Sequence, residues 1–421
     1  MFLIYQIFFF LILLISPIII IFRILKNKED KIRFKEKFCF FSKKRGVGNV
    51  IWFHGSSVGE ILSIIPIIKK YEKDRSIQKI LITSSTLSSS KVFRKFNFKK
   101  TIHQFYPIDL YFFSNLFLNY WKPQVAIFLE SEIWPSMFLT LNKKKIPLIL
   151  LNARITKKTF RKWKKVNLVS ESVFDKIKIA YPQNIETKYF LKKLEVKNIK
   201  SIGNLKFIDA EHKSKNKLDK KITQKIKKFK IWVAASTHQN EEIFAANAHI
   251  LLKKKNKKIL TIMIPRHIDR VNHIISEIQK LNLKVIKHTS KNKSFDDVDI
   301  YMVDSFGESE KFYKLASTVF MGGSLTNKGG QNPLEAARFG AKTLHGPYIE
   351  NFKEIYKLLK VYKLSNMVKT SKKLASSIKF KKNTEKGIQI KNFGRIIFKR
   401  TIKELDKIIY NEVKKTKFLG L

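Results

Sequence analysis

The side chains that could do chemistry stand where short apolar runs give way to polar turns. Residues 50–53 are one such run, and His54-Gly-Ser-Ser-Val-Gly59 joins it to Glu60. Residues 61–71 carry enough apolar positions for a helix packed on a sheet, so Glu60 is predicted at the beginning of that helix. The helix dipole favours negative charge there. We therefore expect Glu60 to be ionised at neutral pH, which is the state that a general base requires.

The same segment fits other patterns. Residues 55–59 read Gly-x-Ser-x-Gly, which before a helix is the pattern of a hydrolase nucleophile elbow, with Ser57 as nucleophile. Several strands precede the elbow in that fold, whereas only an apolar N-terminus and a basic connector come before it here. No Gly-Lys-Ser/Thr closes the segment, so it is not a Walker loop. An ordinary βα turn with a helix-opening glutamate remains the alternative for the segment considered alone.

Two further predicted strand ends carry polar groups. Glu130 and Glu132 follow the apolar run 125–129, and Asn152-Ala-Arg154 follows the run 146–151. Ligands of parallel α/β sheets collect at the carboxyl ends of strands, so three polar ends on one edge indicate a site. Arg154 is a candidate for holding an anionic substrate group, because its guanidinium suits carboxylate and phosphate. A solvated strand end or a helix cap is the alternative for either glutamate alone.

The glycine-rich segment 322–335 is the most informative for a ligand. It reads Gly322-Gly-Ser324 and continues, after five residues, as Gly330-Gln-Asn-Pro-Leu-Glu335. Glycines let backbone amides approach an anion, and a helix N-terminus immediately after them is a phosphate site. Asn332 fits the N-cap, Pro333 the first helical position and Glu335 the acid of a capping box. Glu335 either serves that cap alone or also holds ribose hydroxyls.

Alternating apolar runs and amphipathic stretches must position these groups. Strands are predicted at 50–53, 80–84, 102–106, 125–129 and 146–151, and again at 231–235, 259–264, 300–303 and 318–321. Such alternation indicates βαβ units and mostly parallel sheets. Residues 157–200 are interpreted as helical and polar, and the lysine-rich residues 210–230 as a linker followed by a helix. The predicted fold class is α/β, with two doubly wound, Rossmann-like domains facing a cleft.

The domain boundaries follow from this pattern and from the N-terminus. Residues 2–22 carry no charge and are rich in Phe, Ile and Leu, and about twenty such residues span a bilayer. Basic residues follow from Arg23 onward, so the positive-inside rule predicts a single-pass anchor with the later domains in the cytoplasm. The predicted parts are a transmembrane helix at 1–23, domains at 33–208 and 225–385, and C-terminal helices at 386–421 that pack back on the first domain.

Composition limits the partners. The chain has 421 residues, enough for two domains, and a formal net charge of +52. Lysine is abundant even in predicted loops, as AT-rich coding would produce, and the sequence contains no recognisable nucleic-acid motif, so we expect no nucleic-acid partner. An anionic lipid fits the charge better. Cys39 is the only cysteine, which excludes an intrachain disulfide. Metal-ligand spacing and a dinucleotide-binding G-x-G-x-x-G after a strand are both lacking, so neither a metal nor a dinucleotide is predicted.

Two doubly wound domains, a nucleotide-type site in the second and a candidate base in the first describe a GT-B glycosyltransferase. The motifs go further: in order, they closely resemble those of the bacterial 3-deoxy-D-manno-octulosonic acid (Kdo) transferases of lipid A assembly, from the N-terminal anchor to about Asn351-Phe352. They are Trp52-Phe-His-Gly-Ser-Ser-Val-Gly-Glu60, Glu130-Ser-Glu-Ile-Trp-Pro135, Asn152-Ala-Arg154, Gly203-Asn-Leu-Lys206, Ser236-Thr-His238 with Glu241-Glu242, Pro265-Arg-His267, Asp304-Ser-Phe-Gly-Glu308, Gly322-Gly-Ser324 and Gly330-Gln-Asn-Pro-Leu-Glu335.

The resemblance implies a membrane-anchored, metal-independent, inverting enzyme of the inner membrane that uses no cofactor. It would transfer Kdo from CMP-Kdo to a tetra-acylated lipid A precursor (lipid IVA) in lipopolysaccharide core biosynthesis, with the first domain binding the acceptor and the second the CMP-sugar. By the same resemblance Glu60 is the general base, and Glu130 and Lys206 support the transition state, although composition alone gives Lys206 no special status. The implied CMP-binding residues are Pro265, Arg266, Phe306, Gly307, Glu308, Asn332, Pro333, Leu334 and Glu335.

Two other functions remain open at this point. Another membrane-associated GT-B glycosyltransferase using a UDP-sugar would differ in its donor pocket and acceptor loops. A non-enzymatic protein that binds anionic lipid would need only the charge and the apolar N-terminus. Phe306 is a minor departure, since the family often has Met or another residue at that position.

Overall fold

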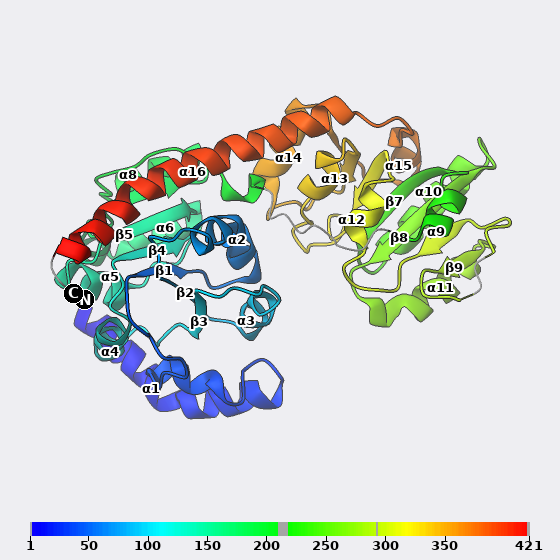
Figure 1. The fold of residues 1–421 in the computed structure, drawn as a ribbon. Coiled ribbons are helices and arrows are strands. Elements are labelled where there is room, and N and C mark those ends of the chain that lie inside the picture. Colours follow the sequence, from blue (N-terminus) through cyan, green and yellow to red (C-terminus); the bar gives the residue numbers. More distant parts are fainter. Residues whose placement is uncertain (1, 209–217, 292–293, 419–421) are drawn as a thin grey trace. The chain divides into compact units, whose positions relative to one another are not determined.

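The structure is a computed structural model that describes residues 2–208, 218–291 and 294–418. The chain forms two compact units. Unit 1 comprises Met1–Glu211 with Gly394–Leu421, and unit 2 comprises His212–Phe393. Each unit contains one parallel sheet with helices packed on it (Figure 1).

Unit 1 has a six-stranded parallel sheet in the order β3-β2-β1-β4-β5-β6. Its strands are β1 (Val50–His54), β2 (Lys79–Ser84), β3 (Thr101–Phe105), β4 (Val125–Leu129), β5 (Leu148–Ala153) and β6 (Ile179–Pro182). This is the strand order of a dinucleotide-binding Rossmann fold, in which the order reverses between β1 and β4. The carboxyl ends of those two strands therefore mark the place where a doubly wound sheet binds ligands.

The helices of unit 1 follow the strands. They are α2 (Val58–Glu72), α3 (Leu87–Phe93), α4 (Tyr111–Trp121), α5 (Pro135–Lys143), α6 (Lys157–Lys165), α7 (Asn167–Phe174) and α8 (Ile185–Lys193), with single 3-10 turns at η1 (Arg33–Phe38) and η2 (Leu205–Phe207). All residues of β1 and β4 are buried because helices cover both faces of the sheet, and both strands are almost entirely apolar in consequence.

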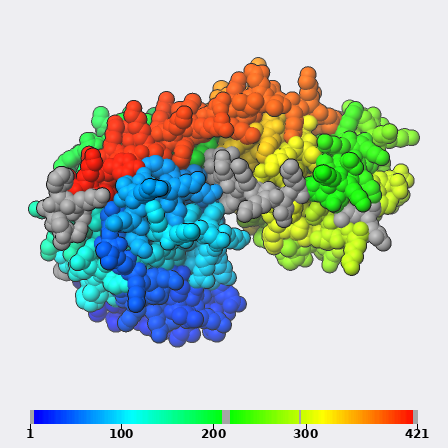
Figure 2. Space-filling model, in the orientation of Figure 1, coloured from blue at the N-terminus to red at the C-terminus, as the bar shows by residue number. Residues whose placement is uncertain are grey.

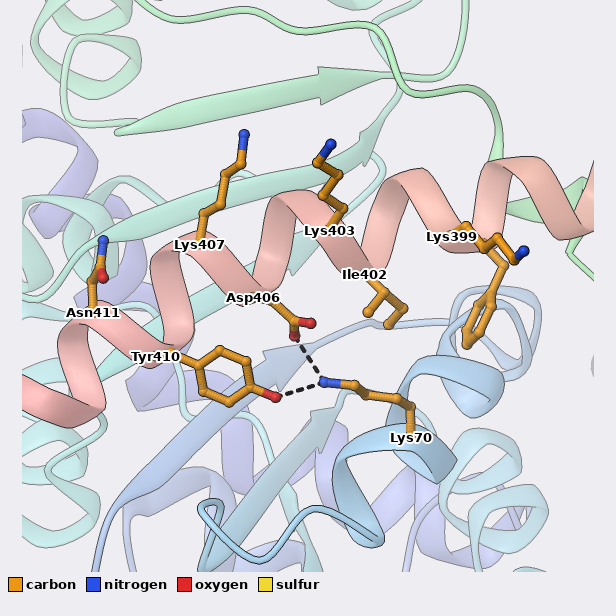
Figure 3. Close-up of a pocket in the computed structure, with 9 residues that line it drawn as sticks. Lys70, Lys399, Ile402, Lys403, Asp406, Lys407, Tyr410 and Asn411 are labelled. Carbon is orange, nitrogen blue, oxygen red and sulfur yellow. Dashed lines mark hydrogen bonds and ion pairs between the residues drawn. The ribbon is translucent and has the colours of Figure 1, made fainter.

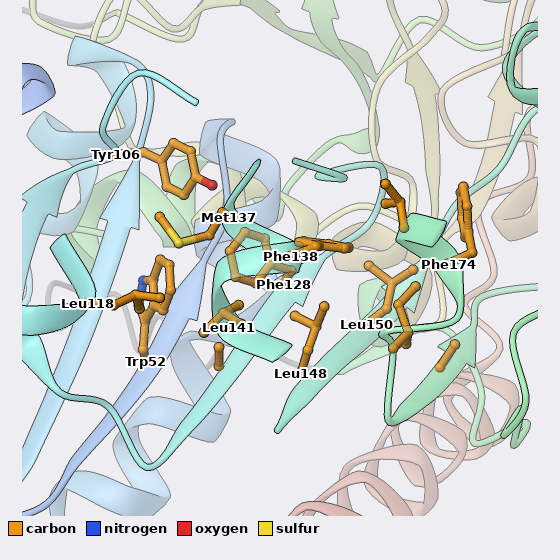
Figure 4. Packing of buried hydrophobic residues seen from close by; sticks show 14 of the residues in the cluster. Trp52, Tyr106, Leu118, Phe128, Met137, Phe138, Leu141, Leu148, Leu150 and Phe174 are labelled. Atoms are coloured by element: carbon orange, nitrogen blue, oxygen red, sulfur yellow. The ribbon is translucent and has the colours of Figure 1, made fainter. Parts of the chain in front are cut away.

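Aromatic and aliphatic side chains pack together on one face of this sheet (Figure 4). The Trp52 ring is fully buried and lies 5.0 Å, centroid to centroid, from the edge-on ring of Phe128 on the neighbouring strand. Phe138 of α5 contacts Phe128 from the helix layer at 5.1 Å. Backbone pairing sets the spacing of β1 and β4, and this packing holds α5 against them.

Helix α1 (Phe2–Leu25) is the helix that the sequence predicts at the N-terminus. Its segment Tyr5–Leu25 is long and apolar enough to cross a membrane. In the structure one stripe of α1 faces unit 1: the Tyr5 hydroxyl donates to Asp109 Oδ2 at 2.7 Å, and Gln6 Nε2 donates to Ser136 Oγ at 2.7 Å. Apolar side chains such as Ile18, 70% exposed, cover the opposite side, and the N-terminal residues form part of the surface of unit 1 (Figure 2).

Unit 2 has a seven-stranded parallel sheet in the order β13-β12-β11-β7-β8-β10-β9. Its strands are β7 (Lys230–Thr237), β8 (Ile259–Pro265), β9 (Val285–Lys287), β10 (Ile300–Met302), β11 (Thr318–Met321), β12 (Lys342–His345) and β13 (Ser365–Met367). The strand order reverses between β7 and β11, so this sheet has a switch point of its own. The helices are α9 (Lys220–Ile226), α10 (Glu241–Lys253), α11 (Val271–Gln279), α12 (Ser309–Tyr313), α13 (Leu334–Arg338), α14 (Lys353–Val361) and α15 (Ser371–Ser377), with a 3-10 turn at η3 (Ile268–Arg270).

The last helix, α16 (Thr384–Phe418), begins in unit 2, and its residues from Gly394 onward pack on unit 1. Lys70 of α2 lies between two side chains of α16, with its Nζ 2.9 Å from Asp406 Oδ1 and 2.7 Å from the Tyr410 hydroxyl (Figure 3). A shallow pocket of about 560 Å³ opens beside this contact. It is lined mainly by α16 and is separate from the strand-end turns that follow β1 and β4.

The structure corrects the predicted elements at several places. Residues 157–200 are not helical throughout, because β6 interrupts them. Strands β9, β12 and β13 were not predicted: β9 and β13 are three-residue edge strands, and β12 is a four-residue strand containing Lys and His. The predicted C-terminal helices are the single helix α16. Of the predicted linker and helix at 210–230, residues 210–217 lie outside the described residues, and α9 lies within the rest.

Candidate active site

Glu60 lies in the first turn of α2, directly after the β1 turn. Ser57 is the N-cap: its Oγ accepts from the Glu60 amide at 3.3 Å and donates to Glu60 Oε1 at 2.8 Å. The Ser56 amide donates to Glu60 Oε2 at 2.7 Å. The carboxylate therefore folds back over its own turn in a variant of the capping box, in which the amide before the N-cap is the donor. A Cβ on Gly55 would lie 2.8 Å from Leu129 Cδ1 and 3.1 Å from Glu60 Cβ, so only glycine fits beneath the carboxylate.

The protonation of Glu60 differs from the sequence-based expectation. The pKa of Glu60 is raised to about 7: burial is the largest cause, the negative charges of Glu132 and Glu130 also raise it, and the hydrogen bonds from Ser57 and Ser56 oppose the rise. The helix N-terminus alone therefore does not leave Glu60 fully ionised at neutral pH. A pKa near neutrality still suits a general base, because the group can both take up and release a proton at the working pH.

Glu130 and Lys206 are brought together from distant parts of the chain. Glu130 follows β4 with φ 50°, and its side chain is buried. Lys206 Nζ lies 3.0 Å from Glu130 Oε1. Asn152, at the end of β5, joins the two turns: its Nδ2 donates to Glu130 Oε1 at 3.4 Å, and its Oδ1 accepts from the Leu205 amide at 3.0 Å. The strand ends of β4 and β5 and the turn at η2 thus form one hydrogen-bonded group.

Helix α16 supports the turn that carries Lys206. A Cβ on Gly203, which has φ 104°, would lie 2.7 Å from Ile397 Cγ1, and a Cβ on Gly394 would lie 2.3 Å from the Phe207 carbonyl oxygen. Glycine on both sides therefore allows the helix and the turn to approach closely. Sequence analysis predicted that the C-terminal segment packs back on the first domain, but not that it supports the Lys206 turn, since neither glycine belongs to a pattern that predicts contact between segments almost 200 residues apart.

Glu132, the second acid of its motif, contacts the core of unit 1. Its Oε2 lies 3.1 Å from His54 Nε2 and accepts from Trp134 Nε1 at 3.0 Å. On the other side of the ring, His54 Nδ1 lies 2.8 Å from Thr83 Oγ1. A neutral imidazole with its proton on Nε2 satisfies both contacts. This series of side-chain contacts holds Glu132 where its negative charge raises the pKa of Glu60. Arg154 is tied to the same edge through its backbone, its amide donating to the Glu130 carbonyl at 3.1 Å.

In unit 2 the predicted CMP-binding residues lie at or after the carboxyl ends of strands of one sheet. Pro265 ends β8, and the exposed Arg266 comes next, its amide donating to the Thr237 carbonyl at 3.0 Å. The turn after β10 carries Phe306, which is 73% exposed, and Gly307, with φ 84°. Glu308 closes this turn, with its Oε2 2.5 Å from Lys311 Nζ.

The segment 332–335 follows β11 and its glycine-rich turn. Helix α13 begins at Leu334, so Pro333 occupies the N-cap and not the first helical position predicted for it. Asn332 lies one position before the cap and still supports the helix, because its Oδ1 accepts from the Leu334 amide at 3.0 Å. Glu335 lies in the first turn of α13.

The glycine-rich turn Gly322–Leu325 is already filled by a side chain of the protein. Glu241 at the beginning of α10 accepts from the amides of Gly323 at 2.6 Å, Ser324 at 3.0 Å and Leu325 at 2.8 Å. These are the amides that the sequence offered to a phosphate. With Glu241 in place, these three amides are therefore not free to bind a phosphate.

The described residues contain no group of three or more His, Cys, Asp and Glu side chains that could hold a metal ion.

His238 follows the end of β7 and His267 follows the end of β8, and their ring centroids lie 5.6 Å apart. The polar edge of unit 2 therefore offers a cationic side chain, backbone amides and two histidines as its functional groups.

Comparison with known proteins assigns the family. Residues 32–209 match the family described as 3-deoxy-D-manno-octulosonic-acid transferase (kdotransferase). The 3-deoxy-D-manno-octulosonic acid transferase of Rickettsia bellii is 31% identical over 393 residues, covering 92% of this chain and 93% of that protein. The chain belongs to the Kdo transferase family. The Haemophilus influenzae enzyme of the same name is 27% identical, over 83% of each chain.

The family and the fold agree. A putative UDP-N-acetylglucosamine 2-epimerase from Listeria monocytogenes superimposes with a TM-score of 0.57 at 11% identity, covering 86% of this chain and 98% of the other. At that identity the likeness concerns the fold alone, and it confirms the predicted α/β, GT-B-like architecture of two parallel sheets. Kdo transferases are glycosyltransferases, so this chain is a Kdo-transferring enzyme of lipopolysaccharide biosynthesis.

Proposed function

We propose that this Kdo transferase moves Kdo from CMP-Kdo to a tetra-acylated lipid A precursor, lipid IVA, in one inverting displacement with Glu60 as general base. The environment of Glu60 carries the proposal. The Glu60 carboxylate lies at the switch point of unit 1 and has a pKa of about 7. Two hydrogen bonds hold it at the edge where ligands of such sheets bind.

In the proposed reaction the acceptor hydroxyl oxygen bonds to the anomeric carbon of Kdo, on the face opposite the phosphate. The bond from that carbon to the phosphate oxygen breaks, and CMP leaves with the electron pair. The hydroxyl proton passes to a carboxylate oxygen of Glu60, which later releases it to solvent. Attack from the opposite face inverts the anomeric configuration.

Glu130 and Lys206 are proposed to support the transition state as a pair. Lys206 brings a positive charge to an edge that already carries Glu60, Glu130 and Glu132, and the 3.0 Å contact with Glu130 holds its ammonium group in place. A fixed cation near developing negative charge lowers the barrier without reorganisation during the reaction.

Unit 2 is proposed to bind CMP-Kdo, and unit 1 the acceptor. Arg266, exposed at the end of β8, would face the phosphate, and the turn 306–308 and the segment 332–335 would hold the rest of the nucleotide. Arginine and backbone amides can stabilise a leaving phosphate, so the proposal includes no metal ion and no cofactor.

The activity test uses purified protein, CMP-Kdo generated in place and lipid IVA, with product masses read for one or two additions. We expect transfer by the parent and a loss of about 100-fold or more in Glu60→Gln, which keeps the side-chain size but cannot accept a proton. Glu72→Gln at the other end of α2 is the matched control. Transfer from a UDP-sugar instead of CMP-Kdo would contradict the donor, and an active Glu60→Gln would contradict the base.

Attachment to the inner membrane through α1, with both units in the cytoplasm, belongs to the same proposal. The apolar segment Tyr5–Leu25 and the basic residues after it support it. A single span with the N-terminus outside would separate Tyr5 from Asp109. Epitope tags at the two ends test this: a span exposes only the N-terminal tag to protease in spheroplasts. Protection of both tags would favour the packing of α1 on unit 1.

A further inference from the structure

Glu241 is a buried carboxylate held by backbone amides of two different turns. Only 1% of the residue is exposed. Its Oε2 accepts from His238 N at 2.9 Å and from Gly323 N at 2.6 Å. Its Oε1 accepts from Ser324 N at 3.0 Å and from Leu325 N at 2.8 Å. An ionised carboxylate offers about four lone-pair sites, so these four amides use its whole capacity.

The two turns are built around this carboxylate. Successive amides that point into a concavity form an anion-binding nest, and Gly323, with φ 65°, supplies the left-handed residue that such a nest needs. Gly322 allows the β11 turn to reach the β7 turn, since a Cβ there would lie 2.3 Å from the Ser236 carbonyl oxygen. The anion that fills the nest is thus part of the protein.

Contacts lead from the nest to the segment proposed to bind the donor. The Gly323 carbonyl accepts from the Gly330 amide at 2.8 Å, immediately before Gln331 and Asn332. Ser324 extends the contacts to the end of β12, where its Oγ accepts from the Gly346 amide at 2.8 Å. A shift of the nest would therefore displace the start of the 330–335 segment.

We propose that Glu241 is a positioning residue for donor binding: its carboxylate takes the place of a ligand anion in the glycine-rich turn and fixes the 330–335 segment for CMP. The CMP phosphate then binds outside the nest. This inference rests on the proposed binding of CMP-Kdo by unit 2. It differs from a general stabilising role, which would affect folding without affecting one substrate more than the other.

Glu242 provides a matched control on the same helix turn. It is also buried, at 2% exposed, but its carboxylate pairs with Arg270 at 3.2 Å. In Glu241→Gln an amide NH2 replaces one acceptor oxygen and meets two backbone donors. We expect the dissociation constant of CMP, measured by calorimetry on the full chain, to rise about tenfold or more in Glu241→Gln and less than about threefold in Glu242→Gln.

Kinetics and a small anion separate positioning from stability. We expect Glu241→Gln to raise KM for CMP-Kdo much more than KM for the acceptor, and Glu241→Asp to recover part of the loss because it keeps the charge. In Glu241→Ala, formate should restore CMP affinity, whereas chloride at equal ionic strength should not. Equal losses in the Glu241 and Glu242 variants, or unchanged CMP binding in Glu241→Gln, would overturn the proposal.

Hydrogen exchange of the parent protein tests the proposal without any variant. The amides of 323–325 should be protected before CMP is added and gain nothing from it, while protection rises within 330–335. A gain at 323–325 on adding CMP would overturn the inference, because the phosphate would then occupy the nest. A parent that binds no CMP at all would instead overturn the donor assignment on which the inference rests.

Discussion

The pH dependence of transfer should reveal the pKa of Glu60 directly. The structure raises this pKa from 4.5 to about 7, with burial as the first cause and the charge of Glu132 as the second. Because kcat/KM follows the ionised fraction of the base in the free enzyme, the acid limb of its pH profile should bend near pH 7. A glutamate at its ordinary pKa would give a profile that is flat down to about pH 5.

The magnitude follows from the titration curve. With a pKa of about 7, about half of Glu60 is ionised at pH 7 and about one tenth at pH 6. We expect kcat/KM to fall about fivefold between those two values and about tenfold for each further pH unit. The assay is initial-rate transfer with both substrates well below saturation, over pH 5 to about 9, so that the free enzyme is the form that titrates.

Two variants should move this limb in opposite directions. Glu132→Gln removes a negative charge that raises the Glu60 pKa, so the limb should move to lower pH, but not to its ordinary position because burial remains. Ser57→Ala removes a hydrogen bond that lowers the pKa, so the limb should move to higher pH. A parent limb below pH 5, or a shift of both variants in one direction, would refute this account of Glu60.

Stability gives an independent reading of the same pKa. The folded-state pKa of Glu60 lies above its unfolded value of 4.5, so the folded protein binds the proton more tightly between pH 4.5 and about 7. The contribution of Glu60 to stability is therefore highest below pH 4.5 and declines as the pH rises through that window. Glu60→Gln should raise Tm relative to the parent more at pH 8 than at pH 5, and an equal effect at both would contradict the raised pKa.

Three further predictions concern the supports of the site. Lys206→Met leaves the buried carboxylate of Glu130 without its cation, so it should lower the free energy of unfolding by about 1–3 kcal/mol. It should also lower kcat. Urea unfolding and transfer assays measure the two effects, with Lys403→Met as the control. Gly394→Ala places a Cβ 2.3 Å from the Phe207 carbonyl, so Tm and transfer should fall, whereas Lys403→Ala on the exposed side of α16 should change neither. Burial raises the pKa of the Cys39 thiol to about 12, so it should react with a disulfide reagent only on unfolding, and fast reaction of the folded chain would show that η1 opens.

Much of the fold could be predicted from the sequence because buried parallel strands are strongly apolar. Residues 125–129 in β4 and 318–321 in β11 are uninterrupted apolar or β-branched runs, and both strands lie where the pattern indicates. The short edge strands β6, β9 and β13 gave no such signal. Ser365–Met367 in β13 contains Asn, is paired on one side only and has two exposed residues, so burial does not force its sequence to be apolar.

The site was predictable in its positions but not in its contacts. Strand ends carrying Glu60 and Glu130 can be recognised one at a time, whereas the contact between Glu130 and Lys206 joins residues 76 positions apart through Asn152. The prediction that Glu60 is ionised at neutral pH was wrong for a related reason. The main cause of the raised pKa is burial within unit 1, and the second is the charge of Glu132. Neither is a property of the local sequence.

Glu60 and Glu241 occupy equivalent positions in their two sheets but have different roles. Each follows a strand at the switch point of its sheet and opens a helix, Glu60 in α2 and Glu241 in α10. Among the described residues, two hydrogen bonds to its oxygens hold the carboxylate of Glu60, which leaves lone pairs for a substrate proton, whereas four amides saturate that of Glu241. The turns that precede Glu60 and Glu241 look alike in sequence. The number of hydrogen-bond donors around each carboxylate differs, and this number distinguishes a group that can act as a base from one that holds its surroundings in place.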